Sequence, residues 1–298
     1  MAEDDPNKPP AQGGIGGTGI VGTLTDLGSL RVNGLRIATD AETAFSGPFG
    51  AIDATEVMVG DSLTIEASTT EAGLRAQRVH LTQPLVGPVE AISADGRQLR
   101  ILGIDVVLEP GAEMRARPGL RVAVSGIWRG PRVVASRVVP AERGSVSAVA
   151  GVFAAGAGSV GGVPVHGLEA VLPPGGAPDD GSFVTVLGYD TDGGLTATNL
   201  SAGRFFNAAG PLASLSVEGY LDPIEAAPGY TVAGLGHSFD RRAELAAFAA
   251  DRTLFLGPYT GTFDVARGVR LPQDLAARRA FLRENAGPLL TTTALPAR

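Results

Sequence analysis

Short runs of alternating hydrophobic and polar residues recur along most of the chain and predict β-strands. Leu63–Glu66 and Leu120–Val124 are two clear examples. Successive side chains of a strand point to opposite faces, so this alternation places one face on a core and the other toward solvent. Glycine-containing turns separate the runs at short intervals. The pattern therefore indicates a mainly all-β chain.

Comparison of the chain with itself reveals three landmarks that recur in the same order. The first is a strand pair around a central glycine, at Gly34, Gly103, Gly162 and Gly234. The second is a turn that enters an alternating strand, at Gly60, Gly119, Gly181 and Asp251. The third is a closing strand with an alanine, at Ala76, Ala135, Ala197 and Ala266. Order and spacing together predict four copies of one unit.

Each copy contains about five short strands, and about 60 residues can bury only a modest core. A closed barrel suits that size because closure removes the sheet edges. The order of three strands, an optional helix and two more strands is that of a small barrel similar to the oligonucleotide/oligosaccharide-binding (OB) fold. The sequence thus predicts tandem OB-like β-barrel repeats: a flexible Gly/Pro-rich leader over 1–19, units over 20–84, 85–142, 145–204 and 212–272, and a C-terminal helix and tail over 273–298.

Two short helices are expected in the C-terminal part. The first, inserted in the fourth unit, spans Asp240–Ala250 with Asp240 as its cap. Its buried stripe consists of Leu245, Phe248 and Ala249. The second covers about Gln273–Asn285, ends before Gly287 and packs on the final barrel. Its buried side consists of Leu275, Ala276, Arg279 and Leu282.

Composition narrows the class of protein. The chain of 298 residues is 44% hydrophobic, which is too high for a disordered protein. A net charge of −7 makes nucleic acid an unlikely partner, because phosphate backbones repel an acidic chain. Cysteine is absent, which excludes disulfides, thiolate metal sites and cysteine nucleophiles. No apolar run is long enough to predict a transmembrane span.

The first two units resemble the bacterial family called domain of unknown function 5666. The segments that carry the resemblance are Gly14–Gly19, Gly28–Gly34, Val59–Leu63 and Leu74–Ala76. The resemblance is clear over residues 13–140 and faint beyond. It implies a small barrel-like β domain in an exported, often lipid-anchored envelope protein of Gram-negative bacteria. A precursor with an export signal and a lipidated cysteine upstream of Ala2 is the corresponding expectation. The family supplies no catalytic residues to carry over.

The search for chemistry returns few candidates. Gly14–Gly19 matches the letters of a dinucleotide-binding loop, but no strand precedes it, so we interpret it as linker. The three histidines, His80, His166 and His237, fall in different units and lack metal-ligand spacing. Asp190–Gly194 begins like a calcium loop, yet a hairpin turn explains it better. No catalytic residue, cofactor or metal is expected, and the chain is not predicted to be an enzyme.

Aromatic residues give the one binding hypothesis. Trp128, Tyr189 and Tyr259 lie seven or eight residues before the aligned alanines, where the first unit has Thr69. Aromatics at a barrel mouth can stack sugars or bases. They can equally cover the end of a small core, and we favour that structural role. Phe205 and Phe206, between the third and fourth units, are expected to seal a contact between units.

Two functional classes follow. The first is a non-catalytic exported protein of the periplasm or cell envelope, whose tandem barrels act as spacer, docking or assembly module. The alternative is a carbohydrate- or small-ligand-binding protein that uses the aromatic residues Trp128, Tyr189 and Tyr259. The expected partners are envelope proteins or glycans rather than nucleic acid.

Overall fold

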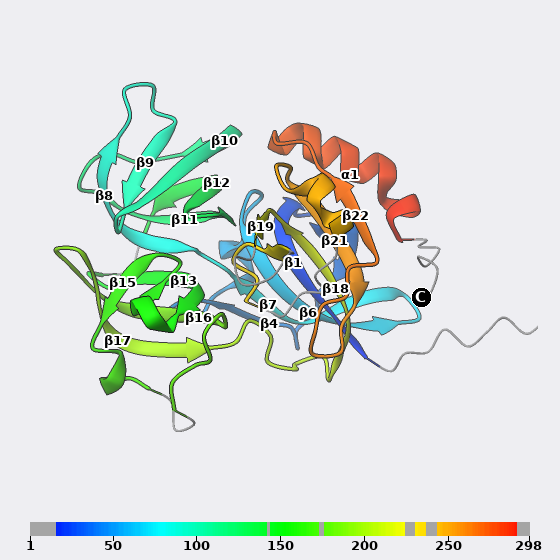
Figure 1. Ribbon diagram of the computed structural model, residues 1–298. Helices are drawn as coiled ribbons and strands as arrows, with labels where there is room; N and C mark the ends of the chain where they lie inside the picture. The colour runs from blue at the N-terminus through cyan, green and yellow to red at the C-terminus, as the bar shows by residue number, and fades with distance from the viewer. Residues whose placement is uncertain (1–15, 142–143, 173–175, 224–229, 237–242, 291–298) are drawn as a thin grey trace, which may run out of the picture.

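The chain folds into two extended β-sheets that curl into barrels, with one α-helix at its C-terminal end (Figure 1). The structure, a computed structural model, describes residues 16–141, 144–172, 176–223, 230–236 and 243–290. In Figure 1 the second and third units lie on one side of the molecule, and the first and fourth units lie with the helix on the other. The expected all-β class with barrel units is confirmed.

The first unit is a closed ring of five strands. Around the ring the order is β1–β2–β3–β7–β6, and β6 pairs again with β1. Only the β3–β7 pairing is parallel. Its strands are β1 (Gly17–Asp26), β2 (Leu30–Val32), β3 (Leu35–Ala38), β6 (Ser62–Thr70) and β7 (Gly73–Leu81). Between β3 and β6 lie β4 (Ala44–Gly47), β5 (Gly50–Ala51) and the short 3₁₀ helix η1 (Ala54–Glu56).

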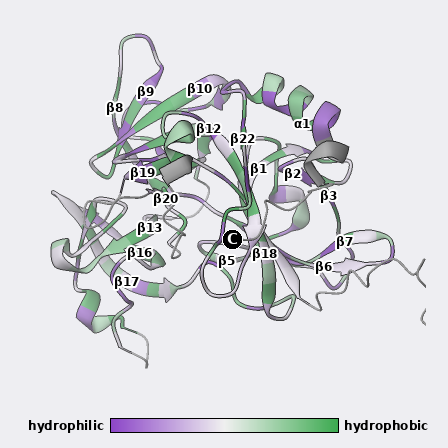
Figure 2. Cartoon of the chain, turned by 45° about the vertical axis from the view of Figure 1, so that its right-hand side comes forward, coloured by the Kyte–Doolittle hydropathy of each residue, from purple (hydrophilic) through white to green (hydrophobic). Residues whose placement is uncertain are grey.

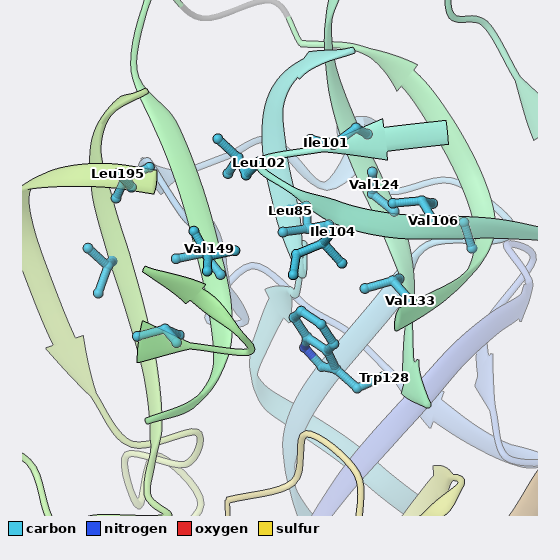
Figure 3. Packing of buried hydrophobic residues seen from close by; sticks show 14 of the residues in the cluster. Leu85, Ile101, Leu102, Ile104, Val106, Val124, Trp128, Val133, Val149 and Leu195 are labelled. Carbon is cyan, nitrogen blue, oxygen red and sulfur yellow. The ribbon is translucent and has the colours of Figure 1, made fainter. Parts of the chain in front are cut away.

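The second and third units repeat this order of pairings. The second contains β8 (Leu85–Ile92), β9 (Gln98–Ile101), β10 (Ile104–Met114), β11 (Arg121–Arg129) and β12 (Arg132–Pro140). The third contains β13 (Ser147–Ala154), β14 (Ser159–Val160), β15 (Val163–His166), β16 (Phe183–Thr191) and β17 (Gly194–Ala202), with η2 (Ala155–Ala157) and η3 (Leu168–Ala170). Strand β8 pairs with β13, so the two barrels share one ten-stranded sheet and one core (Figure 3).

In the first three units, the recurring alanine of the closing strand lies opposite a small residue at a β-bulge. In the first three units the register shifts where Ala67, Gly126 and Gly188 pair with Ala76, Ala135 and Ala197. The two strands approach so closely there that a Cβ on Gly126 would lie 2.5 Å from the carbonyl oxygen of Val134. At Gly188 the corresponding distance to the Thr196 oxygen is 2.0 Å. Small residues are therefore required at the bulge.

The fourth unit contains β18 (Leu212–Gly219), β19 (Leu221–Pro223), β20 (Tyr230–Val232), η4 (Ala243–Phe248), β21 (Thr253–Pro258) and β22 (Arg267–Arg270). Strand β18 pairs with β21 on one side and, in parallel, with β1 on the other. The fourth unit is thus joined to the sheet of the first. Among the described residues, β20 pairs only with β19, so the described strands of the fourth unit do not form a closed ring.

The first predicted helix differs from the structure. Over 243–248 the chain forms the 3₁₀ helix η4 rather than an α-helix, and the expected cap Asp240 lies outside the described residues. Leu245 is buried, and Phe248 packs edge-on against Phe255. A 3₁₀ helix repeats every three residues, so it turns both of these side chains to the same side.

The second predicted helix is present but differs in extent and orientation. Helix α1 spans Leu275–Leu290, and the carboxylate of Asp274 accepts a hydrogen bond from the Ala277 backbone N–H at its start. It continues past Gly287, because a glycine within a helix costs only about 1 kcal/mol. Leu282 is buried as expected, but Ala276 is exposed, and the fully buried arginine is Arg278.

Hydrophobic residues occur in the strands of every unit (Figure 2), and they form separate buried clusters in the first unit, in the second and third units together, and in the fourth. Helix α1 adds a further small cluster. Its Leu282 packs with Leu254 of β21 and with Leu271, which follows β22. The helix also contacts β10 of the second unit and β1 of the first. The C-terminal helix therefore packs on more than the final unit.

Candidate functional site

Trp128 lies inside the molecule, where the second, third and fourth units meet. Its side chain is 5% exposed, and its indole N–H donates a hydrogen bond to the carbonyl oxygen of Ala150 at 2.9 Å. Figure 3 shows the ring beside Leu85 and Ile104. Gly161 and Gly234 press against the indole so closely that a Cβ on either would lie about 2.5 Å from it. In this arrangement the ring fills the core and lines a small internal cavity of about 30 Å³.

Tyr189 and Tyr259 do not join Trp128 in one site. Trp128 lies two residues beyond the bulge residue of its strand, whereas Tyr189 lies one residue beyond Gly188. That difference turns Tyr189 to the opposite face of its strand, where it is 51% exposed. Tyr259 is half-buried against the core of the fourth unit. Ligand binding by these three residues stays a prediction, with Tyr189 as the exposed member.

The remaining sequence candidates are dispersed. Asp192 and Gly193 form the two-residue turn of the β16–β17 hairpin, and Asp190 pairs with Arg121 at 2.9 Å. His166 ends β15, and His237 lies outside the described residues. In the part of the chain that the structure describes, no three His, Asp or Glu side chains are grouped to hold a metal ion. Of the two described histidines, His80 lines a pocket.

A buried group of four charged residues, which we call the charge quartet, joins the units. It consists of Glu109 of β10, Glu218 of β18, Arg252 beside β21 and Arg278 of α1, each at most 3% exposed. Arg252 pairs with both glutamates, at 2.6 Å to Glu218. Arg278 pairs with Glu109 at 2.8 Å and with Glu218 at 3.1 Å. Two positive and two negative charges cancel.

The first unit also contacts the charge quartet. The backbone N–H of Thr23 in β1 donates a hydrogen bond to Glu218 at 2.6 Å. Burial disfavours the charged carboxylate, but the positive charges of Arg252 and Arg278 and this hydrogen bond outweigh burial and lower the pKa of Glu218 to about 2. The first, second and fourth units and the C-terminal helix therefore meet at one charge-balanced centre.

A polar pocket of about 260 Å³, which we call the inter-unit pocket, lies between the first and third units. The first unit contributes Ser46, Arg78 and His80, and the third contributes Thr185, Asn199 and Ser201. The segment after β17 adds Arg204 and Phe206. A water occupies about 30 Å³ in the liquid, so the volume corresponds to about nine waters.

Arg204 is buried in the wall of the inter-unit pocket without an acidic partner. It is 7% exposed, and no carboxylate of a described residue lies within 4.0 Å of its guanidinium. Its terminal nitrogens donate to the Thr64 hydroxyl and the Gly234 carbonyl oxygen, while Nε has no hydrogen-bond partner. The guanidinium lies 3.9 Å from the ring centre of Phe183. Burial lowers the pKa of Arg204 to about 9, so it remains positively charged at pH 7.

Arg78, in contrast, has an acidic partner. It lies 3.4 Å from Glu66, whose carboxylate also accepts hydrogen bonds from the backbone N–H groups of Phe206 and Ala208. The Arg78 guanidinium covers the ring of Phe206 at 4.3 Å from its centre. Since Glu66 balances Arg78, the charge of Arg204 is the one at the pocket that no described acidic residue compensates.

His80 and Ser46 form a pair in the pocket that needs a chemical test. The Ser46 hydroxyl lies 2.9 Å from Nδ1 of His80, a distance typical of a nucleophile and its base. However, burial and the charges of Arg78 and Arg204 lower the pKa of His80 to about 3. An imidazole with that pKa is a poor base at neutral pH, and no carboxylate orients it. The pair is suited to hydrogen bonding with a ligand rather than to nucleophilic catalysis.

Part of this pocket has a sequence signal. Arg78 and His80 alternate on β7 and therefore face the same side of the strand. Arg204 has no such signal, because it lies between two units and its partner Thr64 is 140 residues away. Of the two expected sealing residues, Phe205 packs against the core of the fourth unit, whereas Phe206 is 51% exposed beside the pocket.

The fold and the pocket define an all-β protein of small barrels with a candidate ligand site between two of them. The model of the family described as Domain of unknown function (DUF5666) matches residues 18–80, which identifies the first barrel as a domain of that family. The match covers one unit, so the resemblance of the second unit stays a prediction. Neither curated proteins nor solved structures include a match to the chain. No helix within the described ranges is long and apolar enough to cross a membrane.

Proposed function

We propose that this chain is a non-catalytic binding protein of the bacterial cell envelope that holds a small ligand in the inter-unit pocket. The observation that carries the proposal is Arg204, a buried cation that lines this pocket and has only neutral partners among the described residues. Burying a charge without a counter-charge is costly, and an anionic ligand can supply the missing charge. Binding sites concentrate such groups in concave pockets.

The arrangement of the units supports binding more than spacing. Strand β18 pairs with β1, and the charge quartet contacts the first, second and fourth units. The fourth unit thus packs against the first. A spacer would instead arrange its units in an extended row, because that arrangement spans the greatest distance. Residues of the pocket come from the first and third units, so their relative placement determines its shape.

Blocking the pocket tests the proposed function. Asn199→Trp places a large side chain at the pocket, and Thr198→Trp places the same side chain on the neighbouring exposed position of β17, which does not line it. We expect monosaccharides and sugar acids, screened by thermal shift, to raise the Tm of the wild type and of Thr198→Trp but not of Asn199→Trp. Equal Tm shifts in the two variants would place binding elsewhere, and no shift with any compound would reject the proposal.

Location in the envelope is part of the proposal and is tested separately. The support is the family match of the first unit and the absence of cysteine, which suits an oxidising compartment. Fractionation of cells that express the complete gene should place the protein in the envelope or periplasm with a processed N-terminus. Recovery in the cytosol with an unprocessed N-terminus would remove this part and leave the pocket proposal intact.

Docking of an envelope protein is the second candidate function. It is favoured by a larger groove of about 410 Å³ between the first and second units, lined by apolar residues that include Phe49, Met58, Val86 and Ala123. Met58 is 42% exposed there. If the groove binds a partner protein, Met58→Arg should abolish its co-purification from envelope extract and leave ligand binding in the inter-unit pocket unchanged.

A further inference from the structure

We infer that the inter-unit pocket takes a small hydroxylated ligand that carries one carboxylate, that is, a sugar acid of monosaccharide size. This inference deepens the proposed function and rests on it.

The net positive charge at the pocket favours a ligand with one negative charge. Arg78 is already balanced by Glu66, and His80 is neutral at pH 7, so Arg204 contributes a net charge of one. A carboxylate bound in the pocket that Arg204 lines matches this charge. A phosphate monoester carries nearly two negative charges at pH 7, and the second would lack a partner.

The rest of the pocket is suited to hydroxyl groups. Ser46, Thr185, Asn199 and Ser201 offer hydroxyls and an amide that donate and accept hydrogen bonds. His80 adds a neutral imidazole, which is also both donor and acceptor. A sugar ring presents several hydroxyls of the same dual character. A purely apolar acid would leave these groups without partners.

The arginines are held in place before a ligand arrives. The Phe183 ring supports Arg204, and the Phe206 ring supports Arg78. Such contacts fix the planes of the guanidinium groups and reduce the entropy lost on binding. With a volume of about nine waters, the pocket is large enough for one sugar ring.

Calorimetric titration at pH 7 with glucuronate, glucose and glucose 6-phosphate tests the inference. We expect glucuronate to bind about 10- to 100-fold more tightly than glucose, the range that a charge-assisted hydrogen bond supplies. Glucose 6-phosphate should bind more weakly than glucuronate. Arg204→Met should remove the preference for glucuronate over glucose, Arg204→Lys should restore part of it, and the exposed Arg36→Met should leave it unchanged.

The outcomes separate this inference from the proposed function. If glucose and glucuronate bind equally and Asn199→Trp blocks both, the inference that the ligand carries a carboxylate is wrong, and the proposed binding pocket remains. If glucose 6-phosphate binds more tightly than glucuronate, the inference that the ligand carries a single negative charge is wrong. Failure of all three compounds would overturn the sugar acid, while the wider thermal-shift screen still decides the proposed function. If Arg204→Met does not fold, Ser201→Trp provides a second test, and undiminished glucuronate binding by that variant would overturn the inference.

Discussion

The molecule contains two buried arginine centres that differ in charge balance. At the charge quartet, Arg252 and Arg278 each face two glutamates, and every charge has a partner. At the inter-unit pocket, Arg204 is buried almost as completely but has only neutral partners among the described residues. A balanced centre needs nothing further, whereas an unbalanced one benefits from an added anion.

The two centres also differ in what they join. The quartet links segments that are 143 and 169 residues apart, and its member Glu218 lines a small cavity of about 30 Å³. The inter-unit pocket separates the first and third units, and its walls are mostly polar. This contrast indicates that buried arginine stabilises the assembly of units at the first centre and serves recognition at the second. The same substitution at the two centres should therefore have different consequences.

The largest effect is expected from Arg252→Met. The substitution leaves Glu109 and Glu218 buried with Arg278 as their only cationic partner. Removing one partner of a buried ion pair typically costs about 3–5 kcal/mol because a charge remains uncompensated. Urea unfolding should show a loss of this size, with the exposed Arg36→Met as control. A loss below about 1 kcal/mol would show that the quartet contributes little to joining the units.

A smaller effect is expected from pH, and the two centres should respond in different ranges. Burial, Arg78 and Arg204 lower the pKa of His80 from 6.5 to about 3. A histidine kept neutral in the folded state favours unfolding once the unfolded chain binds protons, so stability is full above pH 6.5 and falls as pH decreases toward 3. Between pH 6.5 and 5 the loss should be about 2 kcal/mol.

The pH response of the quartet begins lower. The pKa of Glu218 is about 2 in the folded state and 4.5 without its partners, so its contribution is present above pH 4.5 and lost between 4.5 and 2. His80→Gln should therefore flatten the stability profile between pH 6.5 and 5 and retain the fall below 4.5. Urea midpoints across pH measure both. An unchanged slope above pH 5 in His80→Gln would show that His80 is not desolvated by the pocket.

The difference between the centres also explains what the sequence could predict. The alternation of hydrophobic and polar residues in a strand and the small residues at each bulge are features of short segments of sequence. The sequence therefore predicts the barrel units from this two-residue alternation and from alanines such as Ala76 and Ala135. The one-residue offset of Tyr189 from the position of Trp128 is not visible in the spacing, yet it changes the face of the strand.

Charged centres assembled from distant segments have no local pattern. Helix α1 was expected to bury Arg279, but Arg278 is buried instead, one residue and about 100° around the helix. A hydrophobic stripe cannot reveal this, because the buried charge is determined by Glu109 and Glu218 on other units. Arg204 likewise becomes notable only when its burial and its lack of an acidic partner are known.

The smallest effect on the free energy of unfolding is expected from Arg204→Met. This substitution is the same as Arg252→Met at the quartet, but it removes the arginine at the pocket. The substitution removes hydrogen bonds to Thr64 and Gly234, each worth about 1.5–3 kcal/mol because the donor is charged. It also removes a buried cation that has no acidic partner among the described residues, and the several kcal/mol that its burial costs offset most of that loss. The net change in unfolding free energy without ligand should lie within about 1.5 kcal/mol, measured in the same urea series. A loss as large as that of Arg252→Met would mean that Arg204 is a structural residue already compensated in the folded state, and the functional distinction between the two centres would fail. A small loss together with a missing ligand-induced rise in Tm would instead assign Arg204 to recognition, because ligand binding stabilises only the state that holds the intact site.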